Sequence, residues 1–227
     1  QRPAPASARF DPGLPGDERG SDIARSLAAF ARRMPSRLLD LLLPPTCPVT
    51  GERVAAPGLL SAAGWARLSC IDDPVCARCG APFAPDYGAD AECAACIAEP
   101  PAFERARAAI AYDETAHALV TAFKYADRTE LAPLLAGLMA RAGAGLFGPD
   151  TVLAPAPLHR RRLFARRYNQ AGLLAAALAE RTGLPVVHDA LFRRRATTPQ
   201  TRLSAESRRR NVAGAFAPRP SPAGLWC

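Results

Sequence analysis

The sequence has no long hydrophobic run and few aromatic residues, which make up 7% of the chain. Its longest apolar cluster, 38–43, is interrupted by Asp40 and followed by two prolines, whereas a membrane-spanning helix needs about 20 apolar residues. We therefore expect no membrane span. No segment typical of an export signal opens the chain, so we also expect no export. Hydrophobic residues at 49% and charged residues at 22% are ordinary for a globular protein and exclude a fibrous or wholly disordered chain.

Lysine is nearly absent, since Lys124 stands alone beside 28 arginines. The formal net charge is +8, yet residues 159–211 alone carry +10, which leaves −2 for the remainder. A basic region of this density suits an anionic partner, either a phosphorylated small molecule or nucleic acid. The alternative is a solvated arginine-rich surface. The single lysine indicates a position that needs a compact ammonium group rather than a planar guanidinium.

Six of the seven cysteines lie within residues 46–100. In a chain that is not exported, metal binding is favoured over disulfides. Two Cys-x-x-Cys pairs are separated by thirteen residues, and two such pairs can surround one ion as a closed tetrahedral set, which is how structural zinc is bound. A redox pair is the alternative, although it would need no second motif. We predict one structural Zn²⁺ bound by Cys76, Cys79, Cys93 and Cys96.

Two further cysteines, Cys47 and Cys70, have no such partners. The stretch from Cys47 to Gly51 resembles another metal-binding turn in which Thr50 takes the place of the second sulfur. Without four sulfurs we expect no second metal ion, and free cysteine commonly packs as a small hydrophobic residue. We therefore predict that Cys47 and Cys70 are buried free thiols.

The composition divides the chain into four parts. Residues 1–20 are rich in Pro, Gly and charge and are predicted to be a disordered tail. Residues 21–45 have apolar residues every three or four positions, which predicts an amphipathic helical segment. Residues 46–100 hold the cysteines, have little apolar periodicity and are predicted to be a zinc-ribbon domain that needs its metal to fold. Residues 101–227 form the last part.

Strand and helix patterns alternate in this last part, which predicts an α/β fold with a parallel sheet and flanking helices. The predicted strands and helices are, in order, 107–112 (strand), 115–124 (helix), 131–144 (helix), 151–155 (strand), 169–182 (helix), 185–188 (strand) and 212–217 (strand). In such folds ligands bind beyond the carboxyl ends of the strands. The arginine-dense loops 158–170 and 193–211 follow two of these strands, so we predict an anion-binding site there.

A set of short motifs runs from about Leu41 to Phe216. The motifs are LPPTCP, CARCG, CAAC, FKY at 123–125, APAPLH at 154–159, RRYNQ at 166–170, LxRxRxTxxQ at 191–200 and RxxNVxGAF at 208–216. Together they resemble the ComF family of competence-associated, phosphoribosyltransferase-like proteins. The resemblance implies a zinc ribbon ahead of a type I phosphoribosyltransferase fold in the cytoplasm of a bacterium. It also implies a link to the uptake of single-stranded DNA, with the DNA-uptake or helicase machinery as a partner.

Phosphoribosyl transfer needs basic groups and magnesium to neutralise a pyrophosphate leaving group. The resemblance implies a phosphorylated ribose substrate, with Mg²⁺ and phosphoribosyl pyrophosphate bound by an active member. It also implies phosphate or pyrophosphate binding by Lys124, Arg166, Arg167, Asn169, Gln170, Arg195, Gln200 and Arg208, the last three on a hood loop.

The family motif of two adjacent acids followed by Thr-Thr-Gly does not occur in the sequence. In the family this loop holds the ribose and the 5-phosphate. We therefore expect a sheet that is incomplete toward the C-terminus, whether through a frameshift, a fragmentary sequence or a real loss, and we assign no catalytic residue. Two functions remain open: a ComF-like phosphoribosyltransferase-family protein of DNA uptake, and a non-catalytic zinc-ribbon module that binds single-stranded DNA or a partner of the uptake machinery.

Overall fold

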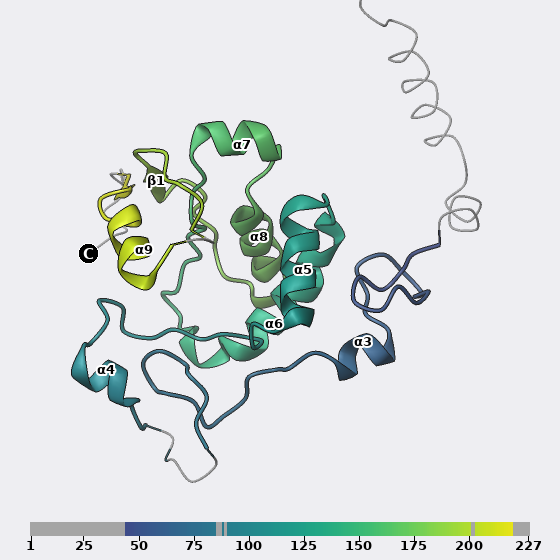
Figure 1. The fold of residues 1–227 in the computed structure, drawn as a ribbon, viewed down its shortest axis with the longest axis horizontal. Helices are drawn as coiled ribbons and strands as arrows, with labels where there is room; N and C mark the ends of the chain where they lie inside the picture. The colour runs from purple at the N-terminus through teal and green to yellow at the C-terminus, as the bar shows by residue number, and fades with distance from the viewer. Residues whose placement is uncertain (1–43, 85–87, 89, 201–202, 220–227) are drawn as a thin grey trace, which may run out of the picture. The chain divides into compact units, whose positions relative to one another are not determined.

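A computed structural model describes residues 44–84, 88, 90–200 and 203–219 (Figure 1). The predicted tail at 1–20 and nearly all of the predicted helical segment at 21–45 lie outside these residues. The elements follow in the order α3 (Ala62–Ala66), α4 (Ala94–Ala98), α5 (Glu114–Tyr125), η1 (Thr129–Leu131), α6 (Ala132–Ala142), η2 (Ala144–Leu146), α7 (Arg160–Arg166), α8 (Gln170–Thr182), β1 (Leu191–Arg193), α9 (Ala205–Val212) and β2 (Phe216–Pro218).

The long helices confirm the helical patterns in the sequence. Helix α5 begins where the Asp113 side chain accepts a hydrogen bond from the backbone N–H of Ala116, which satisfies a donor that the first turn leaves unpaired. Helix α8 begins at Asn169, whose side chain accepts from Ala171 N. It ends at Gly183, which has φ of +74°, a left-handed conformation that favours glycine. Helix α6 covers most of the helix predicted for 131–144, with a short 3₁₀ turn at each end.

The apolar faces of α5, α6 and α8 share one core. Phe123 of α5, Leu135 and Ala136 of α6, and Leu178 of α8 are buried in it. Helices α6 and α8 pack against each other. Leu131 in η1 is fully buried against the same cluster, so the turn between α5 and α6 is fixed by packing.

A second core joins the cysteine-rich region to these helices. Cys47, Leu60 and Leu68 pack with Leu119 of α5 and Leu138 of α6, and all five are buried. Residues 47–68 therefore rest on an apolar surface that belongs to the helical part of the chain. This half of the cysteine-rich region has an apolar core after all, although its sequence shows no periodic pattern.

The strands differ from the prediction. Within the described residues the sheet contains only β1 and β2, which pair in antiparallel fashion with Phe192 opposite Ala217. The predicted strands at 151–155 and 185–188 meet in a single parallel bridge between Leu153 and Val186. A phosphoribosyltransferase-like parallel sheet is not formed by the described residues.

Two other predicted strands are also corrected. The segment 107–112 makes one antiparallel bridge, between Ile110 and Cys70. The predicted strand 212–217 is wrong at its start, because Val212 ends α9 and the strand begins only at Phe216.

Proline explains why the parallel pair stays short. Leu153 N donates to Pro185 O at 2.8 Å and Val187 N donates to Leu153 O at 2.8 Å, as in a parallel ladder. Pro155, Pro157 and Pro185 have no N–H to extend that ladder. The two segments still run in the same direction, so their carboxyl ends lie on the same side of the Leu153–Val186 bridge. The cavity described below lies on that side.

No helix in the described part of the chain is long and apolar enough to cross a membrane.

Candidate functional site

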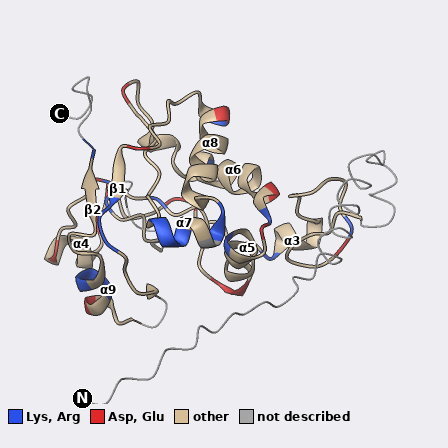
Figure 2. Cartoon of the chain, turned by 90° about the horizontal axis from the view of Figure 1, so that it is seen from above, with Lys and Arg blue, Asp and Glu red and all other residues tan. Residues whose placement is uncertain are grey.

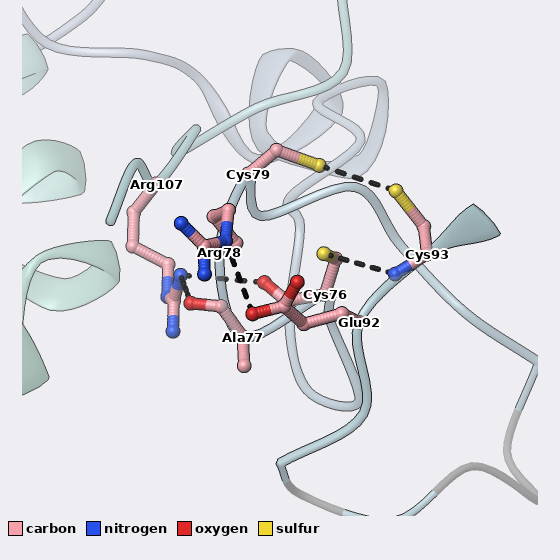
Figure 3. A network of polar contacts seen from close by, with 7 residues as sticks. All are labelled: Cys76, Ala77, Arg78, Cys79, Glu92, Cys93 and Arg107. Carbon is pink, nitrogen blue, oxygen red and sulfur yellow. Dashed lines mark hydrogen bonds and ion pairs between the residues drawn. The ribbon is translucent and has the colours of Figure 1, made fainter. Parts of the chain in front are cut away.

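Four cysteine sulfurs meet in the second half of the cysteine-rich region. The Sγ atoms of Cys76, Cys79, Cys93 and Cys96 all lie within 4.8 Å of one another. Figure 3 shows Cys76, Cys79 and Cys93 turned toward a common centre, with the Cys79 and Cys93 sulfurs 3.7 Å apart. Cys76 and Cys96 are buried, and the other two are half-buried.

Two local structures bring these sulfurs together. Cys76 opens a tight turn that is closed by Gly80 N donating to Cys76 O at 2.9 Å, and Gly80 has φ of +72°. Cys93 stands at the N-terminal end of α4, and Cys96 lies within its first turn. The backbone N–H of Cys93 donates to Cys76 Sγ at 3.3 Å and joins the two pieces.

Polar contacts around the turn hold it in position. Arg78 Nε pairs with Glu92 Oε1 at 3.0 Å, and Arg107 Nη1 donates to Ala77 O at 3.0 Å (Figure 3). Ala106 N donates to Arg78 O at 2.7 Å. These hydrogen bonds attach the turn to segment 105–107, which connects the ribbon to the helical part.

The sulfur chemistry fits a soft divalent cation. Burial raises the pKa of the Cys76 thiol, but the backbone N–H groups of Cys79, Cys93 and Arg78 outweigh it, so this pKa is lowered. Burial and then the neighbouring Cys79, Cys93 and Cys76 raise the pKa of Cys96. Four thiolates this close are stable together only around a positive charge. Four sulfur donors without a further ligand match tetrahedral structural zinc, so the residues fit that metal.

A basic cavity lies beyond the carboxyl end of the parallel pair. Its volume is about 560 Å³, and it is lined by the segments that follow Leu153 and Val186, by β1, and by the residues directly after β1 and β2. Its charged and polar lining residues are His159, Arg160, Asn169, His188, Asp189, Arg193, Arg194 and Arg219. Figure 2 shows the basic residues on α7 and α9, on either side of β1 in the chain.

Positive charge is poorly balanced in this cavity. Among the described residues, Asp189 is the only acidic one in its lining, and Arg219 pairs with it at 3.7 Å. Arg193 Nε is buried and has no hydrogen-bond partner among the described residues, whereas Arg193 Nη2 donates to Thr197 Oγ1 and the guanidinium lies over the Phe216 ring, 5.0 Å from its centroid. Burial first, and then the positive charges of Arg162 and Arg195, lower the pKa of Arg193. An anion bound in the cavity would relieve the repulsion between these like charges.

Three of the predicted residues, Lys124, Arg166 and Gln170, form one group. Gln170 Nε2 donates to the backbone O of Lys124 at 3.2 Å, and Arg166 Nη1 donates to Gln170 Oε1 at 3.4 Å. The Arg166 guanidinium also lies over the Tyr125 ring, 4.8 Å from its centroid. Arg167 ends α7 with φ of +63°. The side chain of Gln170 is only 6% exposed and therefore supports the turn between α7 and α8.

The predicted residues Arg195, Gln200 and Arg208 form a separate group near α9. Arg195 Nη2 donates to the backbone O atoms of Asn211 and Ala213 at 3.1 and 2.9 Å, so it holds the C-terminal end of α9. Arg208 Nε donates to Gln200 O at 3.1 Å. No hydrogen bond between the described residues joins this group directly to Lys124 or Arg166. Of the eight predicted residues, Asn169 alone lines the cavity.

Sequence reasoning selected the two loops of the cavity but missed most of its lining residues. Arg160 and Arg194 are exposed at its edge, and Arg193 lies inside β1. The signal that could have identified these three arginines is their position in the sequence. Each of them lies within the first few residues of an arginine-dense loop. The residues chosen on each loop lie farther along it, although Arg193 is itself part of the LxRxRxTxxQ motif.

Comparison with known proteins agrees with the zinc-ribbon prediction. Residues 38–97 match a family described as the double zinc ribbon domain. The chain is 35% identical over 148 residues to the DNA utilization protein YhgH of Salmonella typhimurium, covering 63% of each chain. It is 32% identical over 156 residues to the protein of the same name from Escherichia coli O157:H7, covering 66% of this chain and 67% of that one.

Another relative is competence protein F of Haemophilus influenzae, 29% identical over 150 residues and covering 63% of this chain and 64% of the relative. The chain thus spans about two thirds of the length of these relatives. No solved structure gives a significant match. The resemblance inferred from the motifs is confirmed. With its zinc ribbon and its four-cysteine group, this chain belongs to the family of the DNA utilization protein YhgH and competence protein F.

Proposed function

We propose that this protein takes part in the uptake or use of DNA in the bacterial cytoplasm, and that its basic cavity binds the phosphate groups of a phosphorylated ribose substrate. One observation carries the proposal: Arg160, Arg193 and Arg194 line a cavity in which Asp189 is the single carboxylate among the described residues, and that carboxylate is already paired. The names of the relatives support the link to DNA. The proposal concerns binding and assigns no catalytic step.

The chemistry of the cavity favours phosphate over other anions. Guanidinium groups bind phosphate oxygens in a two-pronged manner, and such charge-assisted hydrogen bonds are strong. The volume of about 560 Å³ is in the range of ordinary small-ligand sites. It is large enough for a sugar phosphate or a nucleotide. The cavity also lies where open α/β sheets bind ligands, and the parallel pair at Leu153 and Val186 supports a phosphoribosyltransferase-like arrangement.

Two metal ions have different parts in this proposal. Zn²⁺ held by Cys76, Cys79, Cys93 and Cys96 would fix the ribbon and take no part in chemistry, because four sulfurs leave no open position. Mg²⁺ would arrive with a pyrophosphate-bearing substrate. Asp189 is the only carboxylate that the described part of the chain contributes to the cavity lining, and one carboxylate is too few for a dedicated magnesium site.

Calorimetric titration with pyrophosphate and with phosphoribosyl pyrophosphate, each with and without Mg²⁺, tests the proposal. The double variant Arg160→Ala/Arg194→Ala removes two exposed guanidinium groups from the cavity edge. We expect it to weaken binding by about tenfold or more, since charged hydrogen bonds are worth roughly 1.5–3 kcal/mol each. Arg53→Ala, an exposed arginine in the first half of the cysteine-rich region, is the matched control and should bind normally. Equal affinity of all three proteins, or no binding by the wild type, would contradict the proposal.

A second candidate function is binding of single-stranded DNA. Phe164 in α7 is 85% exposed and lies among the arginines of that helix, so a base could stack on it. In that case Phe164→Ala should weaken binding of a fluorescent oligonucleotide by about fivefold or more. It should not change the affinity for pyrophosphate, and affinity for the oligonucleotide should fall steeply with salt. Phe103→Ala, an exposed phenylalanine outside α7, serves as control.

A further inference from the structure

The two halves of the cysteine-rich region repeat the same turn. In the second half, Cys76 N donates to Ala81 O at 2.8 Å and Gly80 N donates to Cys76 O at 2.9 Å. In the first half, Cys47 N donates to Glu52 O at 2.7 Å and Gly51 N donates to Cys47 O at 2.9 Å. The two glycines have φ of +73° and +72°. An isolated antiparallel bridge flanks each turn, Thr46 with Arg53 and Val75 with Pro82.

The two halves also repeat the short helix. Helix α3 begins after Ser61 and helix α4 begins after Cys93, and each helix is five residues long. Gly64 is the third residue of α3, and Cys96 is the third residue of α4. The four positions that carry sulfur in the second half therefore have counterparts in the first half. Those counterparts are Cys47, Thr50, Ser61 and Gly64.

The surroundings of the first sulfur are repeated as well. Burial raises the pKa of the Cys47 thiol, but the hydroxyl of Thr50 and the backbone N–H groups of Ser61, Thr50 and Val49 lie close enough to Cys47 Sγ to lower it overall. Cys93, at the position equivalent to Ser61, donates its N–H to Cys76 Sγ at 3.3 Å. The first half thus has a backbone that surrounds a thiolate in the manner of a metal-binding ribbon.

The side chains of the first half do not fit a metal ion. Thr50 and Ser61 present hydroxyl groups, which bond to each other at 2.9 Å, and Gly64 has no side chain. A Cβ atom built on Gly64 would lie 2.8 Å from Cys47 Sγ and 3.4 Å from Ser61 Oγ. The Cys47 sulfur therefore occupies the space that a fourth ligand would need. One sulfur and two neutral hydroxyls are a poor donor set for zinc.

We propose that residues 46–68 are a metal-free ribbon, in which hydrogen bonds among Cys47, Thr50 and Ser61 and packing on Leu119 and Leu138 take the place of the ion. The double ribbon then binds one metal ion per chain, in its second half only. Its first half retains the backbone of a metal site, so three cysteines introduced at Thr50, Ser61 and Gly64 create a second one. This inference is independent of the proposed anion site.

Metal content of the purified chain tests the inference. We expect one zinc per wild-type chain and two in the variant Thr50→Cys/Ser61→Cys/Gly64→Cys. With Co²⁺ in place of zinc, the absorption from thiolate-to-metal charge transfer should double in that variant. Adding Cys47→Ser to the triple variant removes a ligand of the new site and should return the content to one. The triple variant should also lose more thermal stability on chelation than the wild type, because the crowding at Gly64 is relieved only when Cys47 turns toward an ion.

Two results would overturn the inference. One is a wild-type chain with two zinc ions; the other is a folded triple variant that still binds one. If the triple variant does not fold, Cys47→Ser in the otherwise unchanged chain decides the matter. That variant must retain the metal content of the wild type, and a loss of metal would show that Cys47 is a ligand.

Discussion

Ser69 and Asp113 lie 44 residues apart, and the Ser69 hydroxyl donates a 2.8 Å hydrogen bond to Asp113 Oδ2. The other carboxylate oxygen, Oδ1, accepts from Ala116 N at 2.8 Å and caps α5. A backbone hydrogen bond adds a second link between the two segments, because Ala111 N donates to Ser69 O at 2.8 Å. One carboxylate therefore fixes both the start of α5 and the strand-like segment that leaves the first ribbon.

Substitution of Asp113 should lower stability in a pH-dependent manner. The backbone N–H of Ala116 and the Ser69 hydroxyl lower the pKa of Asp113. A carboxyl group with a lowered folded pKa adds stability above its unfolded pKa, about 3.9, and this stability is lost as the pH falls through the folded pKa. Asp113→Ala should be less stable than Asp113→Asn at neutral pH, since asparagine also caps helices.

Urea unfolding followed by helical circular dichroism measures this effect. The stability difference between wild type and Asp113→Asn should shrink as the pH is lowered below about 4. Asp150→Asn, at an exposed position outside the helices, is the control and should show no such change. A difference that stays constant down to pH 3 would contradict the role given to the Asp113 charge.

The core between the first ribbon and the helices should depend on Leu119. This side chain is fully buried, and its truncation leaves a cavity that neighbouring helices cannot easily fill. Leu119→Ala should reduce the free energy of unfolding by about 2–5 kcal/mol. Leu59→Ala, at a leucine that is 45% exposed, should cost far less. Similar losses for the two variants would mean that the first ribbon does not rest on this core.

Zinc removal should affect the two ribbons unequally. Metal coordination supplies folding energy on the order of 10 kcal/mol in small zinc domains. Chelation should therefore raise amide hydrogen exchange in residues 75–97, while residues 46–68 and helices α5, α6 and α8 retain their protection. Cys96→Ser should reproduce this pattern and lower the zinc content sharply, whereas Cys70→Ser should not. Equal loss of protection in both ribbons would contradict the expectation.

Gln170 should prove more important for stability than for ligand binding. It is nearly buried, and its amide bonds to Lys124 O and to Arg166. Gln170→Ala leaves the Lys124 carbonyl without this donor, which should cost about 1–3 kcal/mol in urea unfolding. Gln200→Ala is the matched control, because only the backbone of Gln200 makes a hydrogen bond described above. A Gln170→Ala variant that is as stable as the wild type but binds pyrophosphate more weakly would contradict this expectation. It would support the phosphate-binding role predicted for Gln170 from its motif.

The sequence was most informative where spacing alone determines structure. Two Cys-x-x-Cys pairs indicated a four-sulfur group because the turn geometry is local, and the sulfurs do come together. Helices α5 and α8 could be predicted from Asp113, Asn169 and Gly183, since caps act within one turn. Of the residues expected to be buried thiols, Cys47 is buried, but Cys70 is exposed.

Contacts between distant segments could not be predicted in the same way. The parallel sheet was predicted from alternating apolar patterns, but strand pairing also needs N–H donors, which Pro155 and Pro185 lack. The burial of Cys47 depends on Leu119 and Leu138, which are more than 70 residues away in the sequence. The role of Gly64 could not be predicted from the sequence, because it depends on how closely the Cys47 sulfur approaches Gly64 in the folded chain.

The ion pair between Glu99 and Arg209, with Oε1 and Nη1 2.7 Å apart, links the end of α4 to α9. Helix α4 also carries Cys96, so its shape depends on the metal. If zinc is scarce, or if oxidants attack the four cysteine thiolates, α4 would no longer be held through Cys96. Helix α9 would then lose its ion pair with Glu99. The metal-free ribbon and the helical core would persist. Loss of the metal would therefore reach helix α9 through this exposed ion pair, and most of the fold would stay in place.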